Sequence, residues 1–96
     1  MGNFIFNKSL IIGVGLIGSS LAKVIRDKNL SEKIVSSNRS ESTNKKVIEL
    51  GIVDESSSDT KKMVKGSNLV IIATPLSSYE NVLSNKYYLY VQQSFH

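Results

Sequence analysis

Three glycines, Gly13, Gly15 and Gly18, interrupt the stretch LIIGVGLIGSSLAKVI where its apolar pattern changes period. The segment around the first of them, Ser9–Val14, is almost continuously apolar, which is typical of a buried strand. After the glycines, apolar residues recur with the period of an amphipathic helix. The chain is therefore expected to pass from a strand to a helix through a glycine-rich turn. The helix begins at Leu16, and its expected sheet-facing residues are Ile17, Leu21, Val24 and Ile25.

The rest of the sequence repeats this alternation of strands and helices. Alternation of this kind predicts βαβ units and a parallel sheet with right-handed crossovers. We therefore predict an α/β protein with a truncated Rossmann-type, doubly wound parallel sheet of about four strands and flanking helices. The further strands are expected at Lys33–Ser37, briefly within IVDESSS, and at Asn68–Pro75. The further helices are expected around Val47, Ile48 and Leu50, at Asp59–Lys65 and at Leu76–Leu83.

The three glycines match the pattern G-x-G-x-x-G, which is weak alone but specific between a buried strand and a helix. In that setting Gly13 allows the tight turn, Gly15 lets the backbone approach a pyrophosphate, and Gly18 lets the helix pack close to the strand. The pyrophosphate rests on the free N–H groups of the helix N-terminus. The sequence therefore predicts a dinucleotide-binding site.

The end of the second strand bears on which dinucleotide binds. NAD sites usually carry Asp or Glu there to bind the ribose hydroxyls. Here the residue is Asn38, followed by Arg39 and Ser40. Asn38 does not repel a 2′-phosphate, and the Arg39 guanidinium can pair with that phosphate. We expect NADP to be favoured over NAD, with stacking of Arg39 on the adenine of either cofactor as the alternative.

The strand that carries Ile71 and Ile72 is expected to lie beside the first strand, so that the loop after it borders the ribose and nicotinamide. In that loop, Ser77 either contacts the cofactor or caps the following helix. No catalytic or metal-binding residue is predicted. The predicted cofactor-binding residues are Gly13, Gly15, Leu16, Ile17, Gly18, Asn38, Arg39, Ser40, Ala73, Thr74 and Pro75.

Composition narrows the classes of protein further. The chain has 96 residues and a net charge of +4, without a block of like charges, so we expect no nucleic-acid partner. It has no cysteine, and its single histidine, His96, is the last residue, which argues against a metal site. No apolar run is long enough to span a membrane and no signal peptide is recognised. The expected location is the cytoplasm.

The motifs IIGVGLIGSSLA, NRS, ELGIVDE, SNLVIIATP and YENVL together resemble the beginning of prephenate/arogenate (cyclohexadienyl) dehydrogenases. The likeness runs from Leu10 to Leu83. It implies an NAD(P)-dependent oxidoreductase that oxidatively decarboxylates prephenate or arogenate in tyrosine biosynthesis. The resemblance also implies a catalytic histidine and a substrate-binding segment beyond this region, neither of which the sequence matches.

The residues after Leu83, SNKYYLYVQQSFH, look unlike that family. We therefore divide the chain into an incomplete NAD(P)-binding domain, residues 1–83, and an atypical tail, residues 84–96. Tyr87 to Val91 either cover the edge of the sheet as an added strand or are disordered. We expect the chain to be the dinucleotide-binding fragment of such a dehydrogenase and not to be catalytic on its own. The alternatives are a non-catalytic NADP(H)-binding module, a subunit completed by a partner chain that supplies the catalytic half, or a truncated product without function.

Overall fold

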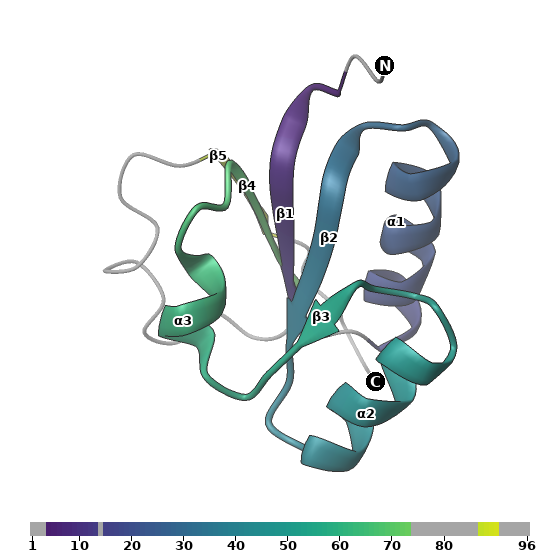
Figure 1. Cartoon of the computed structure of the whole chain (residues 1–96), viewed down its shortest axis with the longest axis vertical. Coiled ribbons are helices and arrows are strands. Elements are labelled where there is room, and N and C mark those ends of the chain that lie inside the picture. The colour runs from purple at the N-terminus through teal and green to yellow at the C-terminus, as the bar shows by residue number, and fades with distance from the viewer. Residues whose placement is uncertain (1–3, 14, 74–86, 91–96) are drawn as a thin grey trace, which may run out of the picture.

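The computed structural model describes residues 4–13, 15–73 and 87–90, which form one parallel sheet with helices on both faces (Figure 1). The carboxyl ends of the strands meet at the bottom of the view in Figure 1. The strands are β1 (Phe6–Ile12), β2 (Ser31–Ser37), β3 (Glu55–Ser56), β4 (Leu69–Ile72) and β5 (Tyr87–Tyr90). The helices are α1 (Leu16–Asp27), α2 (Glu41–Glu49) and α3 (Thr60–Val64).

The order of strands in the sheet is β3-β2-β1-β4-β5. β1 pairs in parallel with β2 on one side and with β4 on the other, where Ile11 lies opposite Ile71. The chain therefore winds outward from β1 in both directions, which places a topological switch point between β1 and β4. The predicted doubly wound α/β fold is confirmed, as is the position of the Ile71 strand beside the first strand.

The predicted sheet of about four strands corresponds to β1 to β4, and β5 extends it at one edge. β5 pairs in parallel with β4, with Leu89 opposite Ile71. Of the two alternatives for this segment, the added strand is what the structure shows for Tyr87–Tyr90. Val91 and the helix expected at Leu76–Leu83 lie outside the described residues.

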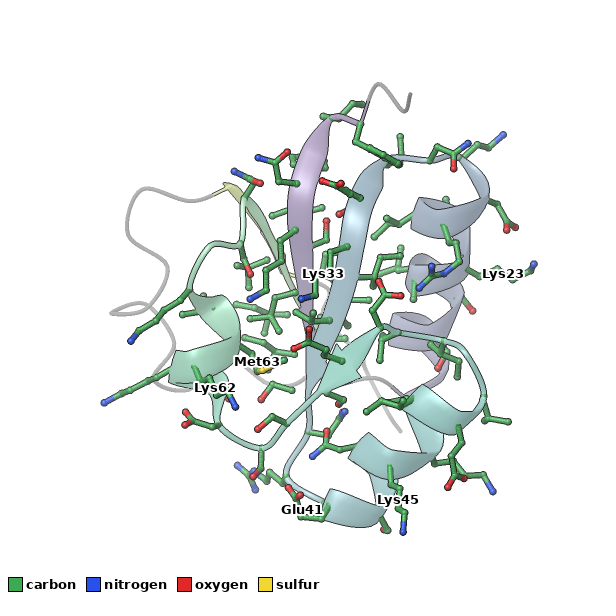
Figure 2. The ribbon with its side chains drawn as sticks, viewed as in Figure 1. Lys23, Lys33, Glu41, Lys45, Lys62 and Met63 are labelled. Carbon is green, nitrogen blue, oxygen red and sulfur yellow. The ribbon has the colours of Figure 1, made fainter. Side chains whose placement is uncertain are left out.

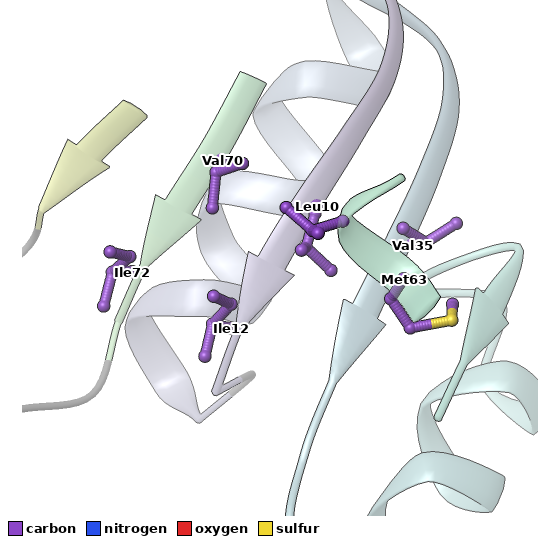
Figure 3. Close-up of a cluster of buried hydrophobic side chains, with 7 residues drawn as sticks. Leu10, Ile12, Val35, Met63, Val70 and Ile72 are labelled. Atoms are coloured by element: carbon purple, nitrogen blue, oxygen red, sulfur yellow. The ribbon is translucent and has the colours of Figure 1, made fainter. Parts of the chain in front are cut away.

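Alternate side chains of the strands feed two separate apolar clusters, because successive residues of a strand point to opposite faces. The cluster under α3 is shown in Figure 3 and consists of Leu10, Ile12, Val35, Met63, Val64, Val70 and Ile72. The cluster on the other face, under α1 and α2, consists of Ile11, Ala22, Ile25, Ile34, Val47, Val53 and Ile71. With both faces covered, the strands are apolar along most of their length, which explains the continuous runs in the sequence.

Two details differ from the sequence-based expectations. β1 begins at Phe6 rather than Ser9, because its first residues pair with β2 from the Phe6–Ser31 position onward. In α1, Val24 is 49% exposed, whereas Ala22 is fully buried. The helix is therefore rotated so that a small residue faces the sheet, which lets the two elements approach closely.

Asn29 ends the α1 segment with a φ of 54°, and Gly51 follows α2 with a φ of 73°. Both residues adopt the left-handed conformation that terminates helices, as Asn and Gly do most readily. Within the described residues, no helix has both the length and the apolar character needed to cross a membrane.

Candidate functional site

The turn between β1 and α1 lies at the carboxyl edge of the sheet and is tied to the neighbouring strand. Gly13 has a φ of 81°, a conformation that residues with a side chain rarely adopt. Its N–H donates to the carbonyl of Ser37, the last residue of β2, at 2.9 Å. The turn after β1 and the loop after β2 are thereby held beside each other.

Gly18 lies where α1 closely approaches β1 and the turn that follows it. A Cβ at this residue would lie 2.8 Å from the carbonyl oxygen of Gly13 and 3.2 Å from Cγ2 of Ile11. The first of these neighbours is backbone and cannot rotate away. The third glycine of the motif is therefore required by the packing of this chain itself.

Gly15 has a different environment, because a Cβ there would meet no atom of the described residues within 4 Å. It is the exposed N-cap of α1, and no side chain caps that end of the helix. The N–H groups of a first helical turn have no partner inside the helix, and the helix dipole makes that end positive. The backbone of Leu16 and Ile17 belongs to this turn. The open space and the uncapped N–H groups suit an anion such as a pyrophosphate.

Asn38 and Arg39 follow β2 at the same edge but have different surroundings. The half-buried Asn38 donates from Nδ2 to Oδ1 of Asn44 at 3.0 Å. Arg39 is exposed, and its side chain has no hydrogen bond or ion pair to any residue that the structure describes. Ser40 is the N-cap of α2, where its Oγ accepts a hydrogen bond from the N–H of Thr43 at 3.3 Å. Of these three side chains, Arg39 is the one placed to meet a ligand's charge.

A second connection links the loop after β2 to the start of α3. The hydroxyls of Ser37 and Thr60 share a hydrogen bond of 2.8 Å, and Asp59 caps α3 by accepting from the N–H of Lys62. Ala73 follows β4, is buried, and donates from its N–H to the carbonyl of Ile12. The sheet edge therefore joins β1, β2 and β4 rigidly around the glycine turn. Thr74, Pro75 and Ser77 lie outside the described residues.

Asn44 is a polar residue of this region that sequence reasoning missed. It lies in the middle of α2 and is 3% exposed. An Asn on the buried face of a helix breaks the apolar pattern, and this break is the signal that could have identified it. Its hydrogen bonds connect α2 to the ends of β2 and β3.

The charged pair Lys33–Glu55 lies away from this edge. Lys33 is in the middle of β2, whereas Glu41 begins α2 at the carboxyl edge (Figure 2). A hydrogen bond and ion pair with Lys33 lower the pKa of Glu55, and the same contact raises the pKa of Lys33. This pair ties β2 to β3 and belongs to the scaffold of the site.

A surface cavity of about 490 Å³ lies between α1 and the segment after α2. Its lining includes Ser20 and Lys23 of α1 and Leu50 after α2. Among the residues that the structure describes, no predicted cofactor residue lines it. The charges of α1 at this cavity are neutralised, because Lys23 pairs with Asp27 at 3.1 Å and Arg26 with Asp54 at 3.3 Å. This cavity is separate from the glycine turn. The described residues contain no cluster of three or more His, Cys, Asp or Glu side chains suited to a metal ion.

The chain matches the model of a known protein family over most of its length. The model of the family described as NADP oxidoreductase, coenzyme F420-dependent, matches residues 8–92. The matched region continues past residue 83, where we placed a domain boundary, and that boundary stays a prediction.

Solved structures with the same fold include dehydrogenases that are at least 25% identical to this chain over the aligned region. Prephenate dehydrogenase from A. aeolicus, in complex with hydroxyphenyl propionate and NAD+, has a TM-score of 0.75 and 25% identity over 88% of this chain. Arogenate dehydrogenase from Synechocystis has a TM-score of 0.75 and 26% identity over 88% of this chain. This chain covers 32% of each of those proteins. The resemblance to prephenate/arogenate dehydrogenases is confirmed for the part of those proteins that this chain covers.

A third structure shows the fold alone. GenD2 from gentamicin A biosynthesis, in complex with NAD, has a TM-score of 0.71 and 14% identity over 88% of this chain and 26% of its own. The Rossmann-type arrangement is thus common to proteins whose sequences differ widely.

Proposed function

Since this chain belongs to the family of coenzyme F420-dependent NADP oxidoreductases, we propose that it binds NADP(H) at the carboxyl edge of its sheet. In this proposal it is the nucleotide-binding part of a prephenate or arogenate dehydrogenase. The observation that carries the proposal is the glycine turn. Gly13 makes the turn, Gly18 brings α1 against β1, and open space lies at Gly15 beside an uncapped helix end.

The residues of the turn fit a dinucleotide pyrophosphate. Backbone N–H groups at the start of α1 can donate to its oxygens, and a side chain at Gly15 would occupy the space that the phosphates need. The backbone of Leu16 and Ile17 contributes to this contact. Ala73 and the adjoining Thr74 and Pro75 border the ribose and nicotinamide in this proposal.

Preference for NADP over NAD rests on the loop after β2. Asn38 is neutral, and Arg39 is exposed beside it without a described partner. A guanidinium can bind a 2′-phosphate in bidentate fashion. Ser40 is already used as the cap of α2, so its backbone and hydroxyl contribute to the shape of the loop. The solved structures named above that contain a nucleotide hold NAD, so this preference needs its own test.

Oxidation of a substrate requires a base and substrate-binding side chains, which are not among the residues described above. The nicotinamide, when bound, supplies hydride transfer, and the protein has to orient a substrate against it. We propose that a base and a substrate-binding segment come from polypeptide outside this sequence, on a partner chain or a longer form of the protein. The whole enzyme then carries out oxidative decarboxylation in tyrosine biosynthesis in the cytoplasm.

The test is a fluorescence titration of the purified chain with NADPH and with NADH, run together with circular dichroism. Saturable binding that is tighter for NADPH, by a folded chain, is expected. The matched variant is Gly15→Val, which should fold but lose binding of both nucleotides, because its side chain fills the space beside the helix N-terminus. A folded wild-type chain that binds neither nucleotide contradicts the proposal.

The NADP preference is tested by Asn38→Asp. A carboxylate at the end of β2 repels a 2′-phosphate and accepts hydrogen bonds from ribose hydroxyls, so the ratio of NADPH to NADH affinity should fall roughly tenfold or more. The control is Asn7→Asp, which makes the same change at the opposite, amino-terminal edge of the sheet. An unchanged ratio in Asn38→Asp would remove the argument for NADP.

A further inference from the structure

A network of polar side chains joins the ends of β2 and β3 to the middle of α2. Asn38 donates from Nδ2 to Oδ1 of Asn44 at 3.0 Å, and Asn44 donates from Nδ2 to the carbonyl of Asn38 at 3.0 Å. The hydroxyl of Ser56 on β3 also donates to Oδ1 of Asn44 and shares a 2.6 Å hydrogen bond with Ser36. The Asn44 side chain is therefore hydrogen-bonded to both the side chain and the backbone carbonyl of Asn38.

The amide of Asn44 makes both of these contacts. The position has to accept a hydrogen bond from the Asn38 side chain and donate one to the Asn38 backbone, and an amide group does both. Asn44 is 3% exposed, so a donor or acceptor left without its partner would be costly. The side chain of Asn38 is thereby fixed with its amide nitrogen directed into the protein.

The same contacts act on the charges of the loop. The hydrogen bond from Asn44 to the Asn38 carbonyl fixes the peptide that leads directly into Arg39. The second hydrogen of Asn44 Nδ2 goes to the Glu41 carboxylate at 3.2 Å, which holds that negative charge against the helix. Asn44 thus hydrogen-bonds to Asn38 and Glu41, the residues that precede and follow Arg39 and Ser40.

We infer that Asn44 is a positioning residue that sets the preference between NADPH and NADH, by fixing Asn38 inward and directing Arg39 toward the ribose 2′-position. This inference rests on the proposed function. Without Asn44, the Asn38 amide loses its 3.0 Å contact and keeps the longer ones, from Nδ2 to the hydroxyls of Ser36 and Ser56 at 3.3 Å. Its side chain is then held less firmly and turns more readily toward the ribose, where it can accept from the 2′-hydroxyl. The loop that presents Arg39 to a 2′-phosphate then loses its anchor.

The experiment compares the affinities of NADPH and NADH for the wild-type chain and for Asn44→Ala, with Asn44→Ser as a second, smaller polar replacement. The control is Asn68→Ala, because Asn68 also ties backbone groups together, accepting at Oδ1 from the N–H groups of Asn7 and Lys8 at the opposite edge of the sheet. We expect NADPH to bind roughly tenfold more weakly to either Asn44 variant, which is the scale of one or two hydrogen bonds, while NADH changes less than twofold. Asn68→Ala should leave the affinity ratio unchanged.

A double-mutant cycle separates positioning from general destabilisation. Asn38→Ala removes the side-chain contact with Asn44 but keeps the Asn38 carbonyl. In that background Asn44→Ala should therefore still lower the ratio, through the carbonyl anchor alone, but by less than in the wild-type chain. Equal losses for both nucleotides, or an unchanged ratio in a folded Asn44 variant, would overturn the inference while leaving the proposed function intact. A folded wild-type chain that binds neither nucleotide would overturn both.

Discussion

At the scale of single residues, two glycines three positions apart have opposite environments. Gly18 lies where a Cβ would meet a backbone carbonyl, whereas Gly15 faces open space. The sequence motif predicted both roles, because the spacing of glycines between strand and helix has a known geometric purpose. The motif does not show how close α1 comes to its neighbours, which the contacts of a Cβ at Gly18 do. The ligand role of Gly15 stays a prediction.

Gly18→Ala should lower stability. The added Cβ would lie 2.8 Å from the Gly13 carbonyl, so α1 or the turn has to shift, at a cost of about 1–3 kcal/mol. Part of that cost is offset by the better helix propensity of Ala. For a chain of this size each kcal/mol corresponds to roughly 4–8 °C in Tm, which thermal unfolding followed by circular dichroism resolves. The control Gly15→Ser should melt at or above the wild-type temperature. Equal melting of Gly18→Ala and wild type would contradict the close approach.

At the scale of elements, the helices show what the sequence pattern could not predict. The spacing of Val24 predicts that it faces the sheet, yet its side chain is 49% exposed. Ala22 is buried because the contact at Gly18 sets the rotation of α1. Asn44 is buried because its hydrogen-bond partners come from β2 and β3, which meet only in the folded sheet. Periodicity identified the helices, but long-range packing determines which face each buries.

The short strand β3 depends partly on an ion pair with its neighbour. The Lys33 ammonium holds the pKa of Glu55 below its ordinary value of 4.5, and Glu55 raises the pKa of Lys33 above 10.5. A lowered carboxyl pKa stabilises the fold above pH 4.5, and this contribution is lost as the pH falls through the folded-state value. A raised lysine pKa stabilises below pH 10.5 and is lost as the pH rises through its folded value. The pair therefore contributes a constant amount between these limits. Both side chains are well exposed, so that amount is small.

Glu55→Gln should lower the free energy of unfolding by the same small amount across the neutral range. The difference from wild type should shrink as the pH falls below 4.5, because protonation removes the pair from the wild-type protein as well. Urea unfolding at a series of pH values measures this. In a Lys33→Gln background the effect of Glu55→Gln should disappear, since the partner is gone. A difference that grows on acidification would contradict the assignment.

At the scale of the whole molecule, the order β3-β2-β1-β4-β5 places the strands of the switch point, β1 and β4, inside the sheet. Without β5, β4 would be an edge strand with unpaired backbone groups along one side. The residues after Leu83 could be suspected of covering that edge because Tyr87 to Val91 have a composition typical of strands. Their register with β4, from Leu69–Tyr87 to Ile72–Tyr90, could not be predicted, because parallel pairing is set by the crossover and the packing around it.

Removal of residues 84–96 therefore tests the predicted boundary at residue 83. The truncated chain loses β5 and exposes the apolar strand β4, whose Val70 and Ile72 are fully buried in the complete chain. We expect a lower Tm by circular dichroism and concentration-dependent association by size-exclusion chromatography, because an unpaired apolar edge pairs with other chains. The full-length chain at the same concentrations is the control. If the truncated chain stays monomeric and melts like the full-length chain, residues 1–83 fold independently and β5 is an addition to a finished domain. If it associates, β5 belongs to the domain and the boundary lies beyond residue 90, because the sheet then needs its fifth strand to protect β4.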